Sequence, residues 1–189
     1  WDISLNFSKN KSKVVSLYPG IATQILFQAS ESIIEARPGQ PYGDIVGFAF
    51  RRTDDGRLLL NSNGEVQAAA ERSVLGNIQP KWLAGLTNTV SFKGFVLSAL
   101  VDIRNGGHVY SATALDQYGR GTGKFTENGD NLIEDGVIAN GSGGYDKSTK
   151  VLKRQSYYGM RSWAGAREPV VISASYVAMR EVTLGYNFK

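Results

Sequence analysis

Two segments in which apolar and polar residues alternate, 82–92 and 95–104, constrain the fold of this chain most strongly. A period of two residues is typical of a β-strand with two different faces. Only the dipeptide at 93–94 separates the segments, which is the loop length of a two-residue β-hairpin. In that hairpin Phe92 lies opposite Phe95 and the apolar faces coincide, whereas a slip by one residue would place them on opposite sides. The sequence therefore predicts an antiparallel pair of long strands.

Three further segments, 1–8, 45–51 and 175–188, are also predicted to be strands. The alternation in the first of them has no exception. In the last one Arg180 falls on the apolar parity, an inconsistency that a β-bulge would relieve. Residues 21–37 fit either a strand pair or a short helix. Because glycine is abundant, at 22 of 189 residues, alongside many β-branched and aromatic residues, we expect an all-β protein.

The composition excludes several kinds of site. The chain has no cysteine and a single histidine, His108, so it cannot form a disulfide framework, a thiolate metal site or a pair of histidine ligands. His108 has no acid or nucleophile at a fixed spacing and is expected to be a polar loop residue. The formal net charge of +4 is scattered along the chain, which does not favour nucleic-acid binding. The glycine-containing segments 119–123 and 141–143 do not lie between a clear strand and a helix, so neither is a nucleotide or nucleophile motif. We expect no enzymatic activity.

Alternation alone does not distinguish a soluble β-sandwich from a transmembrane β-barrel, but three features favour the barrel. Aromatic residues such as Trp82 and Phe92 stand at the two ends of apolar faces whose middle is aliphatic, as at the two interfaces of a bilayer. A two-residue turn follows one strand and the polar stretch 105–172 follows the next, and outer-membrane barrels combine short periplasmic turns with long outer loops. The strands also match the ~9–11 residues that cross a bilayer at a tilt. The basic segment 9–13 is then most simply a solvated periplasmic turn.

In this interpretation one face of each strand contacts lipid and the other faces a water-filled lumen. The residues predicted to face lipid are Trp1, Ile3, Leu5, Phe7, Leu86, Val90, Phe92, Phe95, Leu97, Val101, Leu184 and Tyr186. On the last strand, Tyr176 is expected to lie at one end of the apolar face, with Tyr186 and Phe188 at the other end. On the lumen side, Asp102 and Arg104 lie two residues apart, close enough for a salt bridge or a contact with a plug, with substrate contact as the alternative.

Several short motifs occur in the order typical of one family of transporters. They are found at residues 6–11, 14–17, 39–43, 47–48, 75–77, 80–82, 85–86, 88–89, 92–93, 102–107, 174–176 and 180–186. No single motif is specific, but together they extend over nearly the whole chain. In this combination the chain resembles the SusC/RagA family of TonB-dependent outer-membrane transporters. Ala178 departs from the family pattern, in which arginine or another polar residue is common, and this puts one contact at the lumen or rim in doubt.

The resemblance implies that the chain is the late part of a large antiparallel transmembrane β-barrel, 22-stranded in the family, with long extracellular loops. It places the protein in the outer membrane of a Gram-negative bacterium, in contact with outer-membrane lipid. Family members import oligosaccharides or peptides with a SusD-like lipoprotein as partner and with energy from the TonB complex. The plug domain and the TonB-contacting segment of the family are not expected within these residues, so the chain is expected to be a fragment. The resemblance implies no cofactor.

The polar stretch 105–172 contains most of the candidates for substrate contact. Exposed aromatic rings stack on the apolar faces of sugars while carboxylates and amides bond the hydroxyl groups, although such side chains also suit a protein partner or packing within the loop. The predicted substrate-binding residues are Tyr118, Tyr145, Tyr157, Tyr158, Trp163, Asp102 and Arg104. An oxygen-rich cluster consists of Asn128, Asp130, Asn131, Glu134 and Asp135. This cluster lacks EF-hand spacing, so calcium is a minor alternative and no other metal is expected.

Two alternatives stay open at the level of the sequence. One is a soluble β-sandwich that binds glycans through aromatic loop residues, and the other is a passive porin without TonB machinery. The sandwich requires a second layer over Leu5, Leu86 and Leu97, whereas the barrel leaves these side chains in contact with hydrocarbon.

Overall fold

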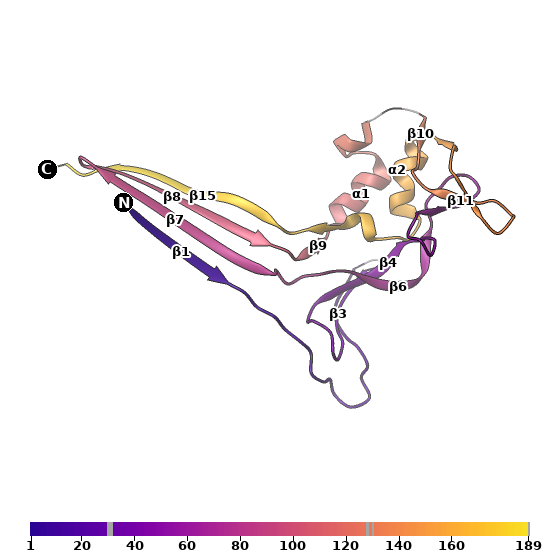
Figure 1. Ribbon diagram of the computed structural model, residues 1–189, viewed down its shortest axis with the longest axis horizontal. Helices are drawn as coiled ribbons and strands as arrows, with labels where there is room; N and C mark the ends of the chain where they lie inside the picture. Colours follow the sequence, from indigo (N-terminus) through magenta and orange to yellow (C-terminus); the bar gives the residue numbers. More distant parts are fainter. Residues whose placement is uncertain (30–31, 128, 130, 189) are drawn as a thin grey trace.

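A long four-stranded sheet forms one end of the molecule, and short strands and helices form the other (Figure 1). The computed structural model describes residues 1–188 except 30, 31, 128 and 130. The long sheet consists of β1 (Asp2–Ser8), β7 (Trp82–Phe92), β8 (Phe95–Asn105) and β15 (Tyr176–Tyr186), in the order β1-β7-β8-β15. All neighbouring strands are antiparallel, and β1 and β15 lie at the edges of an open sheet. The structure is mostly antiparallel sheet, as an all-β protein requires.

The hairpin β7–β8 has the register predicted from the sequence. Phe92 lies opposite Phe95, and the turn residues Lys93 and Gly94 have φ angles of 47° and 87°. Positive φ at both central residues is typical of a type I′ turn, whose twist matches that of the flanking strands. Opposing side chains of β7 and β8 therefore share a face along the whole pair.

The β-bulge predicted in the last strand is confirmed. Met179 pairs with Val101 and Glu181 pairs with Leu100, so Arg180 is the extra residue on β15. An extra residue reverses the alternation between faces. The apolar side chains of β15 therefore have odd numbers before the bulge and even numbers after it.

The segment predicted as a strand over 45–51 belongs to a second sheet rather than to the long one. This sheet contains β2 (Gln24–Ala29), β3 (Ser32–Ala36), β4 (Asp44–Phe50) and β6 (Ala68–Asn77), in the order β2-β3-β4-β6. The ambiguous segment 21–37 is thus a strand pair. The first four residues of β4 are all buried, which no strand of the long sheet shows over its described residues.

The polar stretch 105–172 contains regular structure of its own. Its elements are β9 (His108–Tyr110), α1 (Ala112–Arg120), the 3-10 helix η1 (Lys124–Glu127), β10 (Leu132–Ile133), β11 (Val137–Ala139), β12 (Tyr145–Lys147), β13 (Val151–Leu152), α2 (Arg154–Trp163), the 3-10 helix η2 (Glu168–Val170) and β14 (Val171–Ser173). Ser111 caps the start of α1 by accepting a 3.1 Å hydrogen bond from the Ala114 N–H, and Gly121 ends it at φ 66°. No helix among the described residues is long and apolar enough to cross a membrane.

The hydrophobic core lies in the part of the molecule away from the long sheet. Its buried cluster consists of Leu60, which belongs to β5 (Leu59–Leu60), and of Val66, Leu152 and Met160. These residues come from the two long connections of the chain, 9–81 between β1 and β7 and 106–175 between β8 and β15. We call these two connections together the loop body.

Backbone hydrogen bonds join the two connections into one unit. The Phe48 carbonyl accepts from the Arg167 N–H at 2.8 Å, and the Leu58 carbonyl accepts from the Val137 N–H at 2.8 Å. In addition, β5 pairs with β11 in parallel. The loop body therefore folds as a single structure around a shared core.

Both connections leave the long sheet at the same end. Ser8, the last residue of β1, lies opposite Leu83 near the start of β7, and β8 ends beside the same point. The turn at 93–94 lies at the other end of the sheet (Figure 1). Because β1 runs antiparallel to β7, the basic segment 9–13 leaves the sheet at the loop-body end. It does not lie at the same end as the short turn 93–94, so its predicted place among the short turns is wrong.

Candidate functional site

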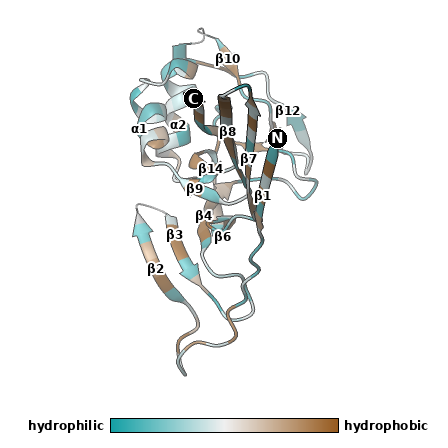
Figure 2. Cartoon of the chain, turned by 90° about the vertical axis from the view of Figure 1, so that its left-hand side faces the viewer, coloured by the Kyte–Doolittle hydropathy of each residue, from teal (hydrophilic) through white to brown (hydrophobic). Residues whose placement is uncertain are grey.

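One face of the long sheet is apolar and uncovered. Leu5, Leu86 and Val101 form a row across three strands in the middle of this face. Leu5 is 68% exposed and Leu97 is 47% exposed, and none of the described residues in the four strands is buried. Figure 2 shows the hydrophobic residues along β7 and β8. Since a soluble fold buries most of its large apolar side chains, this face is suited to an apolar surrounding or a further layer.

The register places the residues predicted to face lipid together on this face. Its polar exception, Asn88, accepts a 2.9 Å hydrogen bond from the indole Nε1 of Trp1. The side-chain amide is thereby partly satisfied within the apolar surface. Contact of these residues with lipid stays a prediction.

Aromatic side chains lie at both ends of the apolar face. At the loop-body end Phe7 and Trp82 have ring centroids 5.9 Å apart, and at the turn end Tyr186 lies 4.7 Å from Phe95 and 4.9 Å from Phe188. The 11 residues of β7 span about 33 Å at ~3.3 Å per residue, which a tilt of ~40° reduces to a height of about 25 Å. This height is that of the apolar band of an outer-membrane barrel.

The opposite face of the sheet carries a polar cluster on β8 and β15. The Tyr176 hydroxyl donates a 2.8 Å hydrogen bond to Asp102 Oδ2, and Arg180 Nη2 donates to the same oxygen at 2.9 Å. Tyr176 therefore lies on the polar face, and its expected place among the aromatic residues of the apolar face is wrong. Arg104 donates to the Ile78 carbonyl at 3.0 Å, so the salt bridge considered between Asp102 and Arg104 is not formed. The bulge brings Arg180 to Asp102 instead.

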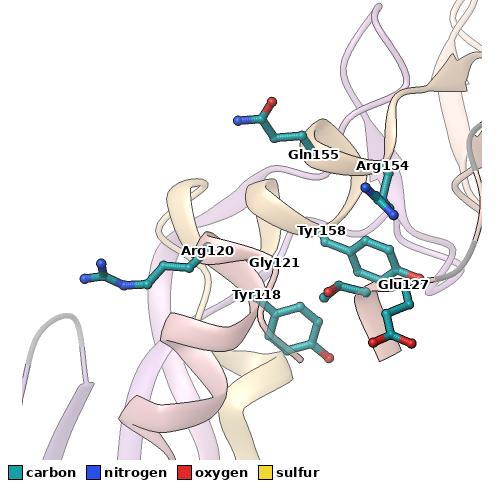
Figure 3. Close-up of a pocket in the computed structure, with 9 residues that line it drawn as sticks. Tyr118, Arg120, Gly121, Glu127, Arg154, Gln155 and Tyr158 are labelled. Atoms are coloured by element: carbon teal, nitrogen blue, oxygen red, sulfur yellow. The ribbon is translucent and has the colours of Figure 1, made fainter. Parts of the chain in front are cut away.

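A pocket of about 330 Å³ lies in the loop body between α1, η1 and α2 (Figure 3). Two predicted aromatic residues, Tyr118 from α1 and Tyr158 from α2, line it together. The charged side chains of Arg120, Glu127 and Arg154 also line the pocket. Its volume is at the lower end of the ~300–1,000 Å³ range of small-molecule sites, and its lining combines rings with hydrogen-bonding groups.

Phe125 on η1 holds the two tyrosines in place. Its ring centroid lies 4.7 Å from that of Tyr118 and 6.1 Å from that of Tyr158. Gly123 permits this arrangement, because a Cβ at this position would lie 2.5 Å from the Phe125 ring. The aromatic wall of the pocket is therefore fixed by packing.

Tyr157 and Tyr145 do not line this pocket. Tyr157 lies under the Arg161 guanidinium, 4.2 Å from the ring centroid, and Arg161 is bonded to Glu134 at 2.5 Å. Tyr145 lies beside Arg57 at 5.7 Å, on β12. The side chain of Trp163 lies outside the described residues. At the pocket the structure thus brings Tyr118 and Tyr158 together with Glu127 and Arg154, and Phe125 packs against both rings. Phe125, Glu127 and Arg154 carry no local sequence signal.

Two of the acidic residues considered as calcium ligands form ion pairs with different basic side chains. Asn128 and Asp130 lie outside the described residues. Glu134 pairs with Arg161, and Asp135 lies 3.4 Å from the Lys147 ammonium. Within the described part of the chain, no group of three or more acidic or histidine side chains could hold a metal ion.

The chain is similar to a known receptor over part of its length. It is 25% identical to TonB-dependent receptor P3 from Formosa agariphila over an alignment of 142 residues, which covers 61% of this chain and 14% of that protein. The chain thus spans about one seventh of the length of this relative. No protein-family model matches the chain. The similarity supports a relationship to TonB-dependent receptors.

Proposed function

We propose that the chain forms part of the wall and the outer loops of a TonB-dependent outer-membrane importer. The observation that carries the proposal is the uncovered apolar face of the long sheet with aromatic side chains at both of its ends. The similarity to TonB-dependent receptor P3 supports it independently. In this role β1, β7, β8 and β15 are wall strands of a SusC/RagA-type barrel of 22 strands.

The free edges of the long sheet are consistent with closure by further strands. Within the described residues, β1 pairs only with β7, and β15 pairs only with β8. Unpaired backbone N–H and C=O groups in hydrocarbon cost several kcal/mol each, so a sheet of this kind is stable in a bilayer only within a closed barrel.

The positions of the connections define an orientation. The two-residue turn at 93–94 lies in the periplasm, and the loop body lies outside the cell, as the short-turn and long-loop pattern of outer-membrane barrels requires. The polar face with Asp102 and Arg180 then lines the lumen or contacts a plug domain. A substrate, an oligosaccharide or a peptide, is held between the loop body and a SusD-like lipoprotein and enters the lumen on energy from the TonB complex.

The uncovered apolar face of the long sheet also argues against the alternative function, a soluble β-sandwich that binds glycans. A β-sandwich requires a second sheet over Leu5, Leu86 and Leu97, and the described residues provide none. A passive porin shares the wall and differs in energy source. Uptake that continues after depletion of TonB would favour the porin over the importer.

Single cysteines on adjacent residues of one strand test the orientation of the wall. The protein is expressed in its outer membrane with a cysteine at Leu97 or at Ser98. A bilayer-soluble maleimide is expected to label position 97, and a water-soluble one position 98, because the two side chains point to opposite faces.

The opposing residues on β7 provide a matched pair of controls. Val90 lies opposite Leu97 and Thr89 lies opposite Ser98, so cysteines at 90 and 89 are expected to repeat the pattern. Labelling of position 98 from lipid and of position 97 from water would contradict the proposed function.

A further inference from the structure

We propose that the pocket between α1 and α2 binds a sugar residue carrying an anionic group, either a carboxylate or a sulfate. This inference rests on the proposed function, because it assigns a substrate class to a pocket in the loop body. It is carried by the lining of the pocket, which combines a fixed aromatic wall, an arginine and a carboxylate.

The aromatic wall suits a ring-shaped ligand. Tyr118 and Tyr158 are both half-buried, and Phe125 packs against both rings. Because these contacts fix the rings before a ligand arrives, binding requires little ordering of side chains. The apolar faces of a sugar ring can lie against such rings while the hydroxyl groups stay accessible to polar partners.

Two of the three charged side chains that line the pocket, Arg154 and Glu127, have no charged partner among the described residues. Figure 3 shows them directing their charged groups to different sides of Tyr158, whereas Arg120 points away. Arg120 also lies 3.7 Å from Asp116, one turn earlier on α1. Arg154 is therefore the cation that is open to a ligand.

The start of α2 adds positive potential at the same place. Arg154 is its first residue and Lys153 its N-cap, and the first turn has no acidic residue and no side-chain cap. Helix N-termini carry a partial positive charge and are normally flanked by acidic residues. Two cations at this position are unfavourable for the free helix, and an anionic group on the ligand relieves the repulsion.

One ligand chemistry satisfies all of these groups. A carboxylate or sulfate accepts hydrogen bonds from the Arg154 guanidinium, and hydroxyl groups elsewhere on the ring donate to the Glu127 carboxylate. A neutral sugar would leave Arg154 without an anionic partner. An acidic peptide could also pair with Arg154, but it has no sugar ring to pack against the tyrosines and no ring hydroxyl groups to donate to Glu127.

The test is calorimetric titration of the purified full-length protein in detergent with three oligosaccharides of equal length: an oligouronate, a sulfated one and a neutral one. We expect at least one anionic oligosaccharide to bind about tenfold or more tightly than the neutral one, and the better of the two identifies the anionic group. Arg154→Gln is expected to remove this preference, while Tyr158→Ala weakens binding of all three. Arg57→Gln is the control, since Arg57 also lies beside a tyrosine but outside the pocket.

The inference would be overturned by equal binding of neutral and anionic oligosaccharides or by an Arg154→Gln variant with unchanged affinity. Binding of an acidic peptide, titrated in the same way, in place of any sugar would overturn it too. Absence of binding to all three oligosaccharides would also overturn it. These failures are separate from failure of the proposed function, because cysteine labelling at 97 and 98 does not depend on the pocket. A reversed labelling pattern would contradict the importer even if the pocket bound sugar.

Discussion

Arg180 and Asp102 form an ion pair across two neighbouring strands, with Arg180 Nη2 and Nε at 2.9 and 3.1 Å from the same carboxylate oxygen. The Tyr176 hydroxyl donates to that oxygen as well, at 2.8 Å. Arg180 is the extra residue of the bulge in β15, so the cluster and the bulge depend on the same position. The reversal of faces along β15 is therefore tied to a group of polar contacts on the polar face of the sheet.

Deletion of Arg180 is expected to prevent folding of the long sheet into the proposed barrel. Without the extra residue, alternation continues unbroken, and Val177 and Met179 move to the face of Asp102. The measurement is the heat-modifiable mobility of the outer-membrane protein on gels. Arg180→Ala is the matched control, because it keeps the bulge and loses only an exposed ion pair, whose contribution to stability water screens. Equal loss of the folded form in both variants would contradict the role of the bulge.

A charge in the middle of the apolar face is expected to destabilise the proposed barrel. Leu5 lies opposite Leu86 near the centre of the sheet, and a lysine at the bilayer midplane of a barrel costs about 2–4 kcal/mol. The free energy of unfolding of Leu5→Lys is measured by urea titration in phospholipid vesicles. Ser4→Lys places the same charge on the opposite face and is expected to cost much less. A larger cost for Ser4→Lys would reverse the assignment of the faces.

Gly76→Ala is expected to weaken the contact between the two connections of the loop body. A Cβ on Gly76 would lie 2.7 Å from Cγ of His108, which comes from the other connection, and such overpacking costs about 1–3 kcal/mol. Faster cleavage of the loop body by trypsin reports the change. Gly85→Ala is the control, since Gly85 also lies in a strand but faces open space. Equal cleavage of both variants would show that His108 moves aside without cost.

Asp55 is expected to make the loop body less stable in acid. Hydrogen bonds from the Arg57 and Thr53 side chains lower the pKa of Asp55 from its usual 3.8 to about 2. Because the pKa is lower in the folded state, the stabilisation is fully present above the unfolded pKa and is lost as the pH falls through about 2. The measurement compares the thermal unfolding of the parent and Asp55→Asn between about pH 4 and about pH 2. The parent is expected to lose stability relative to the variant over this range, and Asp54→Asn controls for the removal of one charge.

The residues of the candidate pocket could be predicted from the sequence only in part. Tyr118 and Tyr158 were identifiable as aromatic candidates in a polar stretch, but their meeting depends on the packing of α1 against α2 around Phe125. Arg154 and Glu127 have ordinary surroundings in the sequence, and only the folded structure places them in the lining of the same pocket.

The sequence by itself determined the two faces of the long strands, the hairpin at 93–94 and the need for a bulge at Arg180, because these depend on a two-residue period and on a short local turn. Only the tertiary structure decided that β1 lies beside β7, that β4 belongs to another sheet and that Asp102 pairs with Arg180 rather than Arg104. These relationships join residues far apart in the chain. Their choice depends on which surfaces pack together, and a local pattern of residues carries no information about that.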